Sequence, residues 1–134
     1  TNGLKLIKLY EEYEKARKNI NNEKLVYIGE EEQKKETYKN GILNGESEYI
    51  GYDYNTKGNY INGKKEGKWI NQVDESIEYF ENNVLKKTEF IDNKTKKLKS
   101  MTIIKENKEI EKYNYNDKNE LVQYLLYDEL QFGN

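Results

Sequence analysis

Residues 58–70 read Gly-Asn-Tyr-Ile-Asn-Gly-Lys-Lys-Glu-Gly-Lys-Trp-Ile. Two short runs of alternating apolar and polar residues flank a loop that opens with Asn62-Gly63 and closes with Gly67. Asn and Gly tolerate the positive φ of a tight hairpin turn, and Tyr, Ile and Trp suit a pleated, half-buried surface. The stretch therefore predicts a β-hairpin.

Related stretches recur along the chain. Residues 38–45 keep the tyrosine, the Asn-Gly turn and the closing glycine, with Ser47 in place of Trp69. Residues 80–85 form a third copy with a second asparagine instead of the turn glycine, and residues 104–109 form a fainter fourth. Equivalent positions in the four copies, at Tyr38, Tyr60, Phe80 and Ile104, lie 22, 20 and 24 residues apart. A recurring period in the twenties is typical of a repeat architecture.

The best-preserved copy resembles the bacterial variant of the MORN repeat, whose pattern is roughly G-x-Y-x-N-G-x-x-x-G-x-W. The residues that occupy these positions are Gly58, Tyr60, Asn62, Gly63, Gly67 and Trp69. The resemblance covers roughly residues 36–127. Members of that family are often described as antitoxin-like or as proteins of unassigned binding function. The resemblance therefore implies a sheet of hairpin repeats that binds a partner without catalysing a reaction.

The composition fits a thin fold. Hydrophobic residues make up 34% of the 134 residues and charged residues 36%, against typical values of about 45–50% and about 25%. Thirteen tyrosines and a net charge of −2 argue against disorder. A single-layer sheet with two wet faces needs this balance, because tyrosines and lysine stems supply its apolar area. We expect one domain over residues 1–134.

Most enzyme classes lack their usual side chains here. Cysteine and histidine are absent, which removes disulfides, thiolate nucleophiles, imidazole bases and the usual zinc ligands. The turns at 92–94 and 117–120 carry oxygen ligands but do not have the spacing of a calcium loop. A small carboxylate-based hydrolase is the remaining enzyme alternative, although 25 acidic residues scattered among 23 basic ones are typical of a solvated surface. We expect no catalytic residue, no metal and no cofactor.

The charge pattern favours a protein partner over nucleic acid or lipid. The net charge is slightly negative, Arg17 is the only arginine, and Glu66 follows Lys64-Lys65. No apolar run approaches the roughly 20 residues of a membrane span, so we expect no membrane insertion. Because the chain begins at Thr1 without Met, a removed leader leaves localisation open between the cytoplasm and export. An exported or cell-surface module that recognises protein or glycan is therefore the alternative function.

The N-terminal segment predicts an amphipathic helix. Apolar residues recur at steps of three and four at Leu6, Leu9, Tyr10, Tyr13, Ala16 and Ile20. We expect a helix over residues 3–22, including its asparagine-rich end, that covers a sheet edge or face; a partner-binding helix is the alternative. Residues 25–28 predict a first strand buried on both sides, and the charge run at 30–36 predicts a connection or a polar strand start.

From Thr37 onward, β-prone runs alternate with turn signals. The predicted strands lie at 48–54, 68–73, 76–80, 84–91, 99–105, 109–115 and 120–127. The last of these is apolar at nearly every position, so a strand sandwiched by the helix and a short C-terminal helix both fit, and we favour the strand. The fold class is mainly β (α+β): one twisted, antiparallel meander of MORN-like hairpins over residues 36–127, with one N-terminal helix.

The turns also predict which residues face each other. Tyr60 opposes Trp69 if the loop covers 62–66, and Trp69 opposes Phe80 if 74–75 is a two-residue turn. A turn at 82–83 makes Phe80 oppose Leu85. Opposed residues share a face of a sheet, so these four side chains predict one apolar stripe across four strands.

The stripe supplies the candidate binding residues. They are Tyr60, Trp69, Phe80 and Leu85, together with Tyr38 as the first repeat's counterpart of Tyr60. We expect part of the stripe to stay accessible and to anchor a protein partner whose identity, like the oligomeric state, the sequence leaves open.

Overall fold

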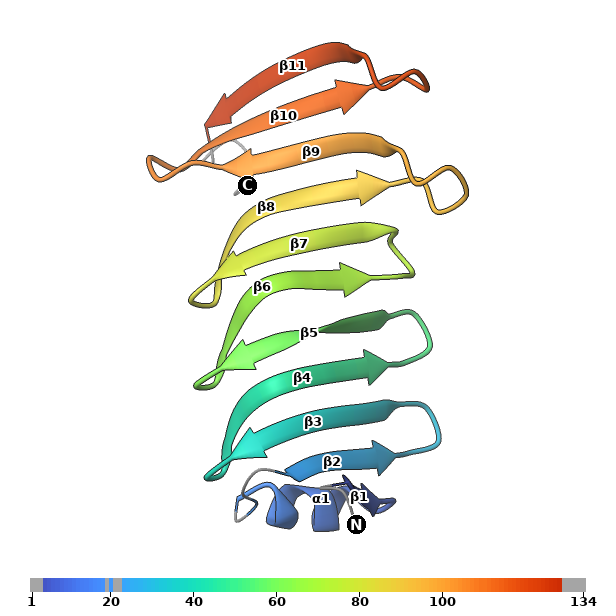
Figure 1. Ribbon diagram of the computed structural model, residues 1–134, viewed down its shortest axis with the longest axis vertical. Helices are drawn as coiled ribbons and strands as arrows, with labels where there is room; N and C mark the ends of the chain where they lie inside the picture. Colours follow the sequence, from blue (N-terminus) through green and yellow to red (C-terminus); the bar gives the residue numbers. More distant parts are fainter. Residues whose placement is uncertain (1–3, 19, 21–22, 129–134) are drawn as a thin grey trace.

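The protein is built as one long sheet with a short helix at its N-terminal end (Figure 1). The computed structural model describes residues 4–18, 20 and 23–128. Within them, eleven strands lie side by side in the order in which they follow along the chain. The first two strands are parallel, and all later neighbours are antiparallel. The predicted fold class, mainly β with a single meander and one N-terminal helix, is confirmed.

The elements follow one another with short connections. Their bounds are β1 Leu4–Ile7, α1 Tyr10–Ala16, β2 Glu23–Ile28, β3 Gln33–Lys39, β4 Ile42–Ile50, β5 Asn55–Ile61, β6 Lys64–Asn71, β7 Ser76–Glu81, β8 Val84–Ile91, β9 Leu98–Ile104, β10 Glu109–Tyr115 and β11 Leu121–Asp128. β8 and β10 have the bounds that the turn signals predicted. Residues 30–32 of the charge run connect β2 to β3, and residues 33–36 form the polar start of β3.

The helix is shorter than predicted, and a strand precedes it. The prediction covered residues 3–22, of which 3, 19, 21 and 22 lie outside the described residues; the structure forms α1 over Tyr10–Ala16 alone. Leu4–Ile7 form β1, whose backbone pairs with β2, so β2 is not the first strand. Leu4 and Leu6 are exposed while Ile7 is buried. The two leucines lie on one face of β1 and Ile7 on the other, as the two-residue period of a strand requires. The helical spacing of the residues that follow concealed this strand.

α1 packs on one face of the sheet, over β1 to β3. Its Tyr13 is 1% exposed and lies in a buried cluster with Leu25, which is 0% exposed. Ile7, Ile20 and Tyr38 complete this cluster. We call the sheet surface that carries Leu25 and Tyr38 the helical face and the opposite surface the open face. Covering the sheet is therefore a structural role of the helix, as predicted.

Tight turns join the strands of three successive hairpins. Asn40-Gly41, Asn62-Gly63 and Asn82-Asn83 each form a two-residue turn in which both residues have positive φ. Turns of this kind have the twist that neighbouring strands need, and asparagine and glycine adopt positive φ with the least strain. The three turns lie on the same side of the sheet, at the ends of the strands (Figure 1).

The predicted register is wrong in two places and right in one. Tyr60 lies opposite Lys65, not Trp69, because the turn has two residues instead of five. Trp69 lies opposite Glu78, not Phe80, because four residues connect β6 to β7 instead of two. Phe80 does oppose Leu85. Irregular pairing beside Gly58 and beside Thr37 adds residues to β6 and β4, and such bulges cannot be counted from turn positions.

Burial is concentrated in the first part of the sheet. The described apolar residues that are buried run from Ile7 to Trp69, and the last buried residue of any kind is Ser76. β11 is a strand as predicted, but the helix does not sandwich it. It forms the C-terminal end of the sheet, far from α1 (Figure 1), and Leu121, Val122 and Tyr124 are exposed there.

Candidate functional site

Three of the predicted binding residues meet as an aromatic row on the helical face. The ring of Trp69 lies edge-on to Tyr60, with centroids 5.0 Å apart, and edge-on to Phe80 at 6.5 Å. Leu85 continues the row as the direct partner of Phe80. The predicted stripe thus exists, although Trp69 joins it by diagonal contacts rather than by direct opposition.

Trp69 lies in the interior of this row. Its side chain is 4% exposed, and its Nε1 donates a hydrogen bond to the carbonyl oxygen of Asn59 at 3.1 Å. The Lys65 Nζ sits 4.8 Å from the indole and 4.9 Å from the Phe80 ring, where it makes cation–π contacts with both. Trp69 is therefore a core residue, and Tyr60, Phe80 and Leu85 are the half-buried members of the row.

Tyr38 does not join the aromatic row. Its ring is 3% exposed and belongs to the cluster beneath α1. Its hydroxyl lies 3.4 Å from the hydroxyl of Tyr13. Tyr38 is therefore part of the core between the helix and the sheet and is not an accessible binding residue.

A buried carboxylate, Glu36, connects these two parts of the core. The side chain is 6% exposed and accepts hydrogen bonds from the Tyr38 hydroxyl at 2.9 Å and from the Tyr49 hydroxyl. Tyr49 also lies 3.3 Å from the Tyr60 hydroxyl. A chain of hydroxyls therefore runs from Tyr13 on α1 to Tyr60 on β5, with Glu36 at its centre.

Burial and hydrogen bonding act in opposite directions on Glu36. Burial raises the pKa of the Glu36 carboxyl group, and the bonds from Tyr49 and Tyr38 partly oppose this rise. Burial likewise raises the pKa of both tyrosines, and the neighbouring carboxylate raises it further. Both oxygens of Glu36 are occupied by tyrosine hydroxyls, so the residue organises the core of the first repeat.

Glu36 was not among the predicted site residues, although the repeats contain a signal for it. Aligned with an offset of 22 residues, Glu36 and Ser47 occupy the positions of Gly58 and Trp69. Glu36 and Ser47 are direct cross-strand partners and both are buried, and the Ser47 Oγ has no hydrogen-bond partner in the structure. Because both positions depart from the repeat pattern together, they indicate that the first hairpin packs its core with different side chains from the second.

The open face carries a polar groove of about 770 Å³ over β2 to β6. Four lysines and three glutamates line it. Lys24 lies 3.9 Å from Glu46, and Lys35 lies 3.8 Å from Glu48. These contacts are long and solvent-exposed, and the charges nearly balance, so the groove offers no strong preference for an anion or a cation.

Tyrosine–glutamate pairs recur on the open face of the C-terminal half. The Tyr79 hydroxyl donates a hydrogen bond to Glu89, and burial together with this bond raises the pKa of Tyr79 to about 12. Two lysines stand over the same ring, Lys87 at 4.3 Å and Lys68 at 5.8 Å from its centroid. The chain itself therefore supplies the cations for this aromatic group.

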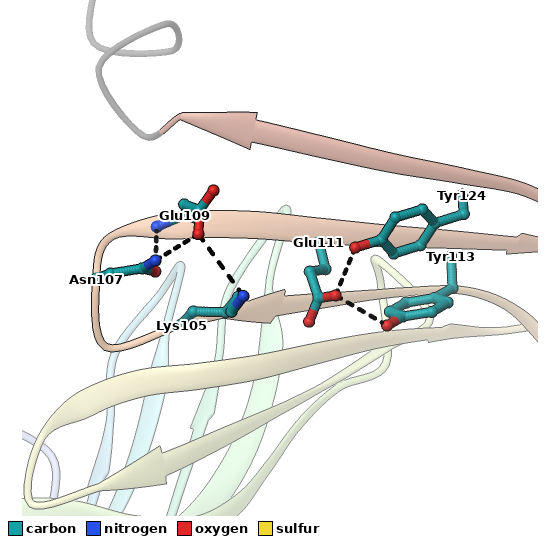
Figure 2. A network of polar contacts seen from close by, with 6 residues as sticks. All are labelled: Lys105, Asn107, Glu109, Glu111, Tyr113 and Tyr124. Carbon is teal, nitrogen blue, oxygen red and sulfur yellow. Dashed lines mark hydrogen bonds and ion pairs between the residues drawn. The ribbon is translucent and has the colours of Figure 1, made fainter.

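The second such group lies beside the outer strand (Figure 2). Glu111 of β10 accepts hydrogen bonds from Tyr124 of β11 at 2.6 Å and from Tyr113 at 3.2 Å. The bond from Tyr124 lowers the pKa of Glu111, and in return Glu111 raises the pKa of Tyr124 to about 12. The two rings are cross-strand partners with centroids 5.0 Å apart.

The sequence contained a signal for this group as well. Glu111 and Tyr113 have the Glu-x-Tyr spacing of Glu36 and Tyr38, which places both side chains on one face of a strand. The group around Glu111 is more exposed than the group around Glu36: Tyr124 is 47% exposed, whereas Tyr38 is 3% exposed. We call Glu111, Tyr113 and Tyr124 the edge cluster.

The described residues contain no group of three or more acidic side chains placed to hold a metal ion. Nor does any helix among them have the length and apolar character needed to cross a membrane. Comparison of the chain with protein-family models and with curated proteins gives no match.

Proposed function

We propose that the protein is a non-enzymatic module that binds another protein through its sheet. The observation that carries the proposal is the excess of apolar surface left uncovered. Fifteen large hydrophobic side chains are exposed among the described residues, while seven hydrophobic residues are buried. Large exposed apolar patches on a protein surface are typical of interaction sites.

The distribution of this surface supports binding along the sheet. Exposed apolar side chains occur on the open face at Ile42, Ile61 and Val84, close to the hairpin turns. Others cluster on β11. Repeat sheets offer such extended surfaces to partners. The resemblance to MORN-like repeats suggests an antitoxin-like partner relationship as one form of this function.

Partner capture by surface variants tests the proposal. The immobilised chain is exposed to extract from cells that produce it, and three double variants are compared: Ile42→Glu with Ile61→Glu on the open face, Tyr60→Ala with Leu85→Ala on the helical face, and Tyr124→Lys with Leu126→Lys on β11. We expect a stoichiometric protein to bind the wild type and to be lost from one variant.

Thermal unfolding provides the control, because a variant counts only if it stays folded at the temperature of capture. If no protein binds the wild type in stoichiometric amount, or if all three folded variants retain it equally, the proposal is wrong.

A further inference from the structure

The outer edge of β11 lacks the features that normally keep an edge strand from pairing with another chain. No described strand pairs with it, and Asp128 is its only charged residue. Lysine or proline on an edge strand normally prevents pairing with other chains. β1, at the opposite end of the sheet, is only four residues long and carries Lys5 in its middle. The two ends of the sheet are therefore protected unequally.

The edge cluster lies on the open face directly beside this strand (Figure 2). Tyr124 belongs to β11 itself, and Glu111 is the cross-strand partner of Leu126. One oxygen of Glu111 accepts both tyrosine hydroxyls. A carboxylate beside two aromatic rings attracts a cation through charge and through the ring faces.

Three other aromatic groups of the protein already contain such a cation. Lys34 stands over Tyr10 and Tyr13, Lys65 over Trp69 and Phe80, and two lysines over Tyr79. Within the described part of the chain, no lysine stands over Tyr113 or Tyr124. Lys105 lowers the pKa of Glu111 from a distance, but its Nζ pairs with Glu109 at 3.6 Å. The edge cluster is thus an acidic and aromatic group without a cation of its own over the rings.

We propose that β11 pairs with an extended segment of a partner protein, and that a lysine or arginine of this segment binds the edge cluster. This proposal rests on the proposed function and adds the site and the chemistry of the partner. Antiparallel pairing, the more stable kind, extends the sheet by about 4.8 Å per strand. A basic residue opposite Tyr124 or Leu126 then lies on the open face and reaches Glu111 across β11.

The charges disfavour a second copy of this chain as the occupant. β11 contains no basic residue, so antiparallel pairing of two β11 strands, which joins their open faces, leaves Glu111 of both copies without a cation. Antiparallel pairing of β1 with β11 also keeps the faces aligned, which places Lys5 on the helical face, away from the edge cluster. A strand of another protein, with apolar residues on either side of a basic one, can pair with the backbone of β11 and also place a cation beside the edge cluster.

Synthetic strands test the pairing and the charge separately. The probes are eight-residue peptides of alternating valine and threonine with blocked ends and a central lysine, glutamate or methionine. We expect the lysine peptide to bind about tenfold more tightly than the glutamate peptide, because a cation–π contact and an ion pair add to the same site. Methylation of alternate backbone amides in the lysine peptide should abolish binding, because it removes the donors that pair with β11.

Matched variants locate the site on the protein. Glu111→Gln should reduce the preference for lysine over glutamate about threefold. Glu89→Gln is the control, because its tyrosine partner already has two lysines of the chain and the preference should stay unchanged. Equal binding of the methylated peptide overturns strand pairing, and equal binding of the lysine and glutamate peptides overturns the cation site. A wild-type dimer that the lysine peptide dissociates makes a second copy the occupant and overturns the proposal as well.

The natural partner separates this proposal from the broader one. If a stoichiometric partner is captured equally by the wild type and by Tyr124→Lys with Leu126→Lys, but is lost from one of the other two double variants, the binding function stands and the assignment to β11 is wrong. If capture is lost only from the β11 variant, both are supported.

Discussion

The position of Trp69 depends on the absence of a side chain at residue 58. A Cβ built on Gly58 would lie 2.2 Å from Cδ2 of the indole, a distance that real side chains do not reach. The glycine therefore leaves room for the ring to lie flat against the neighbouring strand. Gly67 is different, because its φ is +73° and nothing lies within 4 Å of the position of its Cβ.

We expect Gly58→Ala to lower the free energy of unfolding by about 1–3 kcal/mol, as overpacking does. In a Trp69→Ala background, which itself costs about 3–5 kcal/mol, the same change should have almost no effect. Gly67→Ala is the control: backbone strain alone should cost about 1–2 kcal/mol in both backgrounds. Urea denaturation of the six chains measures these values. An equal loss from Gly58→Ala with and without the indole would show that the two residues do not compete for space.

Glu36 and Glu111 have their pKa values shifted in opposite directions, so they should make opposite contributions to the pH dependence of stability. The pKa of Glu36 is raised above its ordinary value of 4.5. The folded protein then binds more protons than the unfolded chain above pH 4.5, and stability falls as the pH rises through the folded pKa. The pKa of Glu111 is lowered, so its contribution is present above pH 4.5 and is lost as the pH falls below that value.

Denaturation across a pH series measures both effects. Relative to the wild type, Glu36→Gln should remove a decline in stability above pH 4.5. Glu111→Gln should instead remove a decline below that pH. Slopes that change in the same direction for both variants would contradict the opposite environments of the two carboxylates.

The β3–β4 and β5–β6 hairpins follow the same backbone course but differ in the side chains that fill the space beside the bulge. β5 and β6 use the pair Gly58 and Trp69, whereas β3 and β4 use Glu36 and Ser47. In both hairpins the pairing shifts at the same place, and the irregular segment contains a glycine with positive φ, Gly45 in β4 and Gly67 in β6. The two pairs are therefore alternative solutions to one packing problem.

Replacing Glu36 and Ser47 by the glycine and tryptophan of the next hairpin should be tolerated only when both residues are changed together. Ser47→Trp alone places an indole against Glu36, and Glu36→Gly alone leaves the hydroxyls of Tyr38 and Tyr49 without their acceptor. We expect the double variant to be about 0.5–3 kcal/mol more stable than the sum of the two single changes predicts. Thermal and urea unfolding of all four chains measure the coupling. Simple additivity would show that the hairpins are not interchangeable.

Turn residues carried most of the information that the sequence held about the elements. Asn-Gly and Asn-Asn pairs located the hairpins because few other residues accept positive φ at two successive positions. They did not locate the bulges at Thr37 and Gly58, which shift the register by their own packing. Residues 4–7 were assigned to a helix because pairing with a distant strand leaves no local pattern in so short a segment. The edge cluster was missed because its members come from two strands, and their contact depends on register.

Stability should be graded along the molecule. In a repeat sheet each unit contacts mainly its neighbours, so local stability follows local burial. All described buried residues lie between Ile7 and Ser76. We expect amide hydrogens of β3 to β6 to exchange more slowly than those of β9 to β11 by at least about tenfold. Hydrogen exchange followed by mass spectrometry or NMR tests this gradient. Uniform protection over both halves would mean that the sheet opens as one cooperative unit.

The order of the strands has a mechanical consequence. With eleven strands in chain order and a spacing of about 4.8 Å, β1 and β11 lie about 48 Å apart, and a pull between them acts across the strands rather than along them. Such a load reaches one ladder of hydrogen bonds at a time, beginning at an outer strand. The sheet should therefore lengthen under low tension in small steps, one hairpin after another, instead of resisting until it ruptures as a whole.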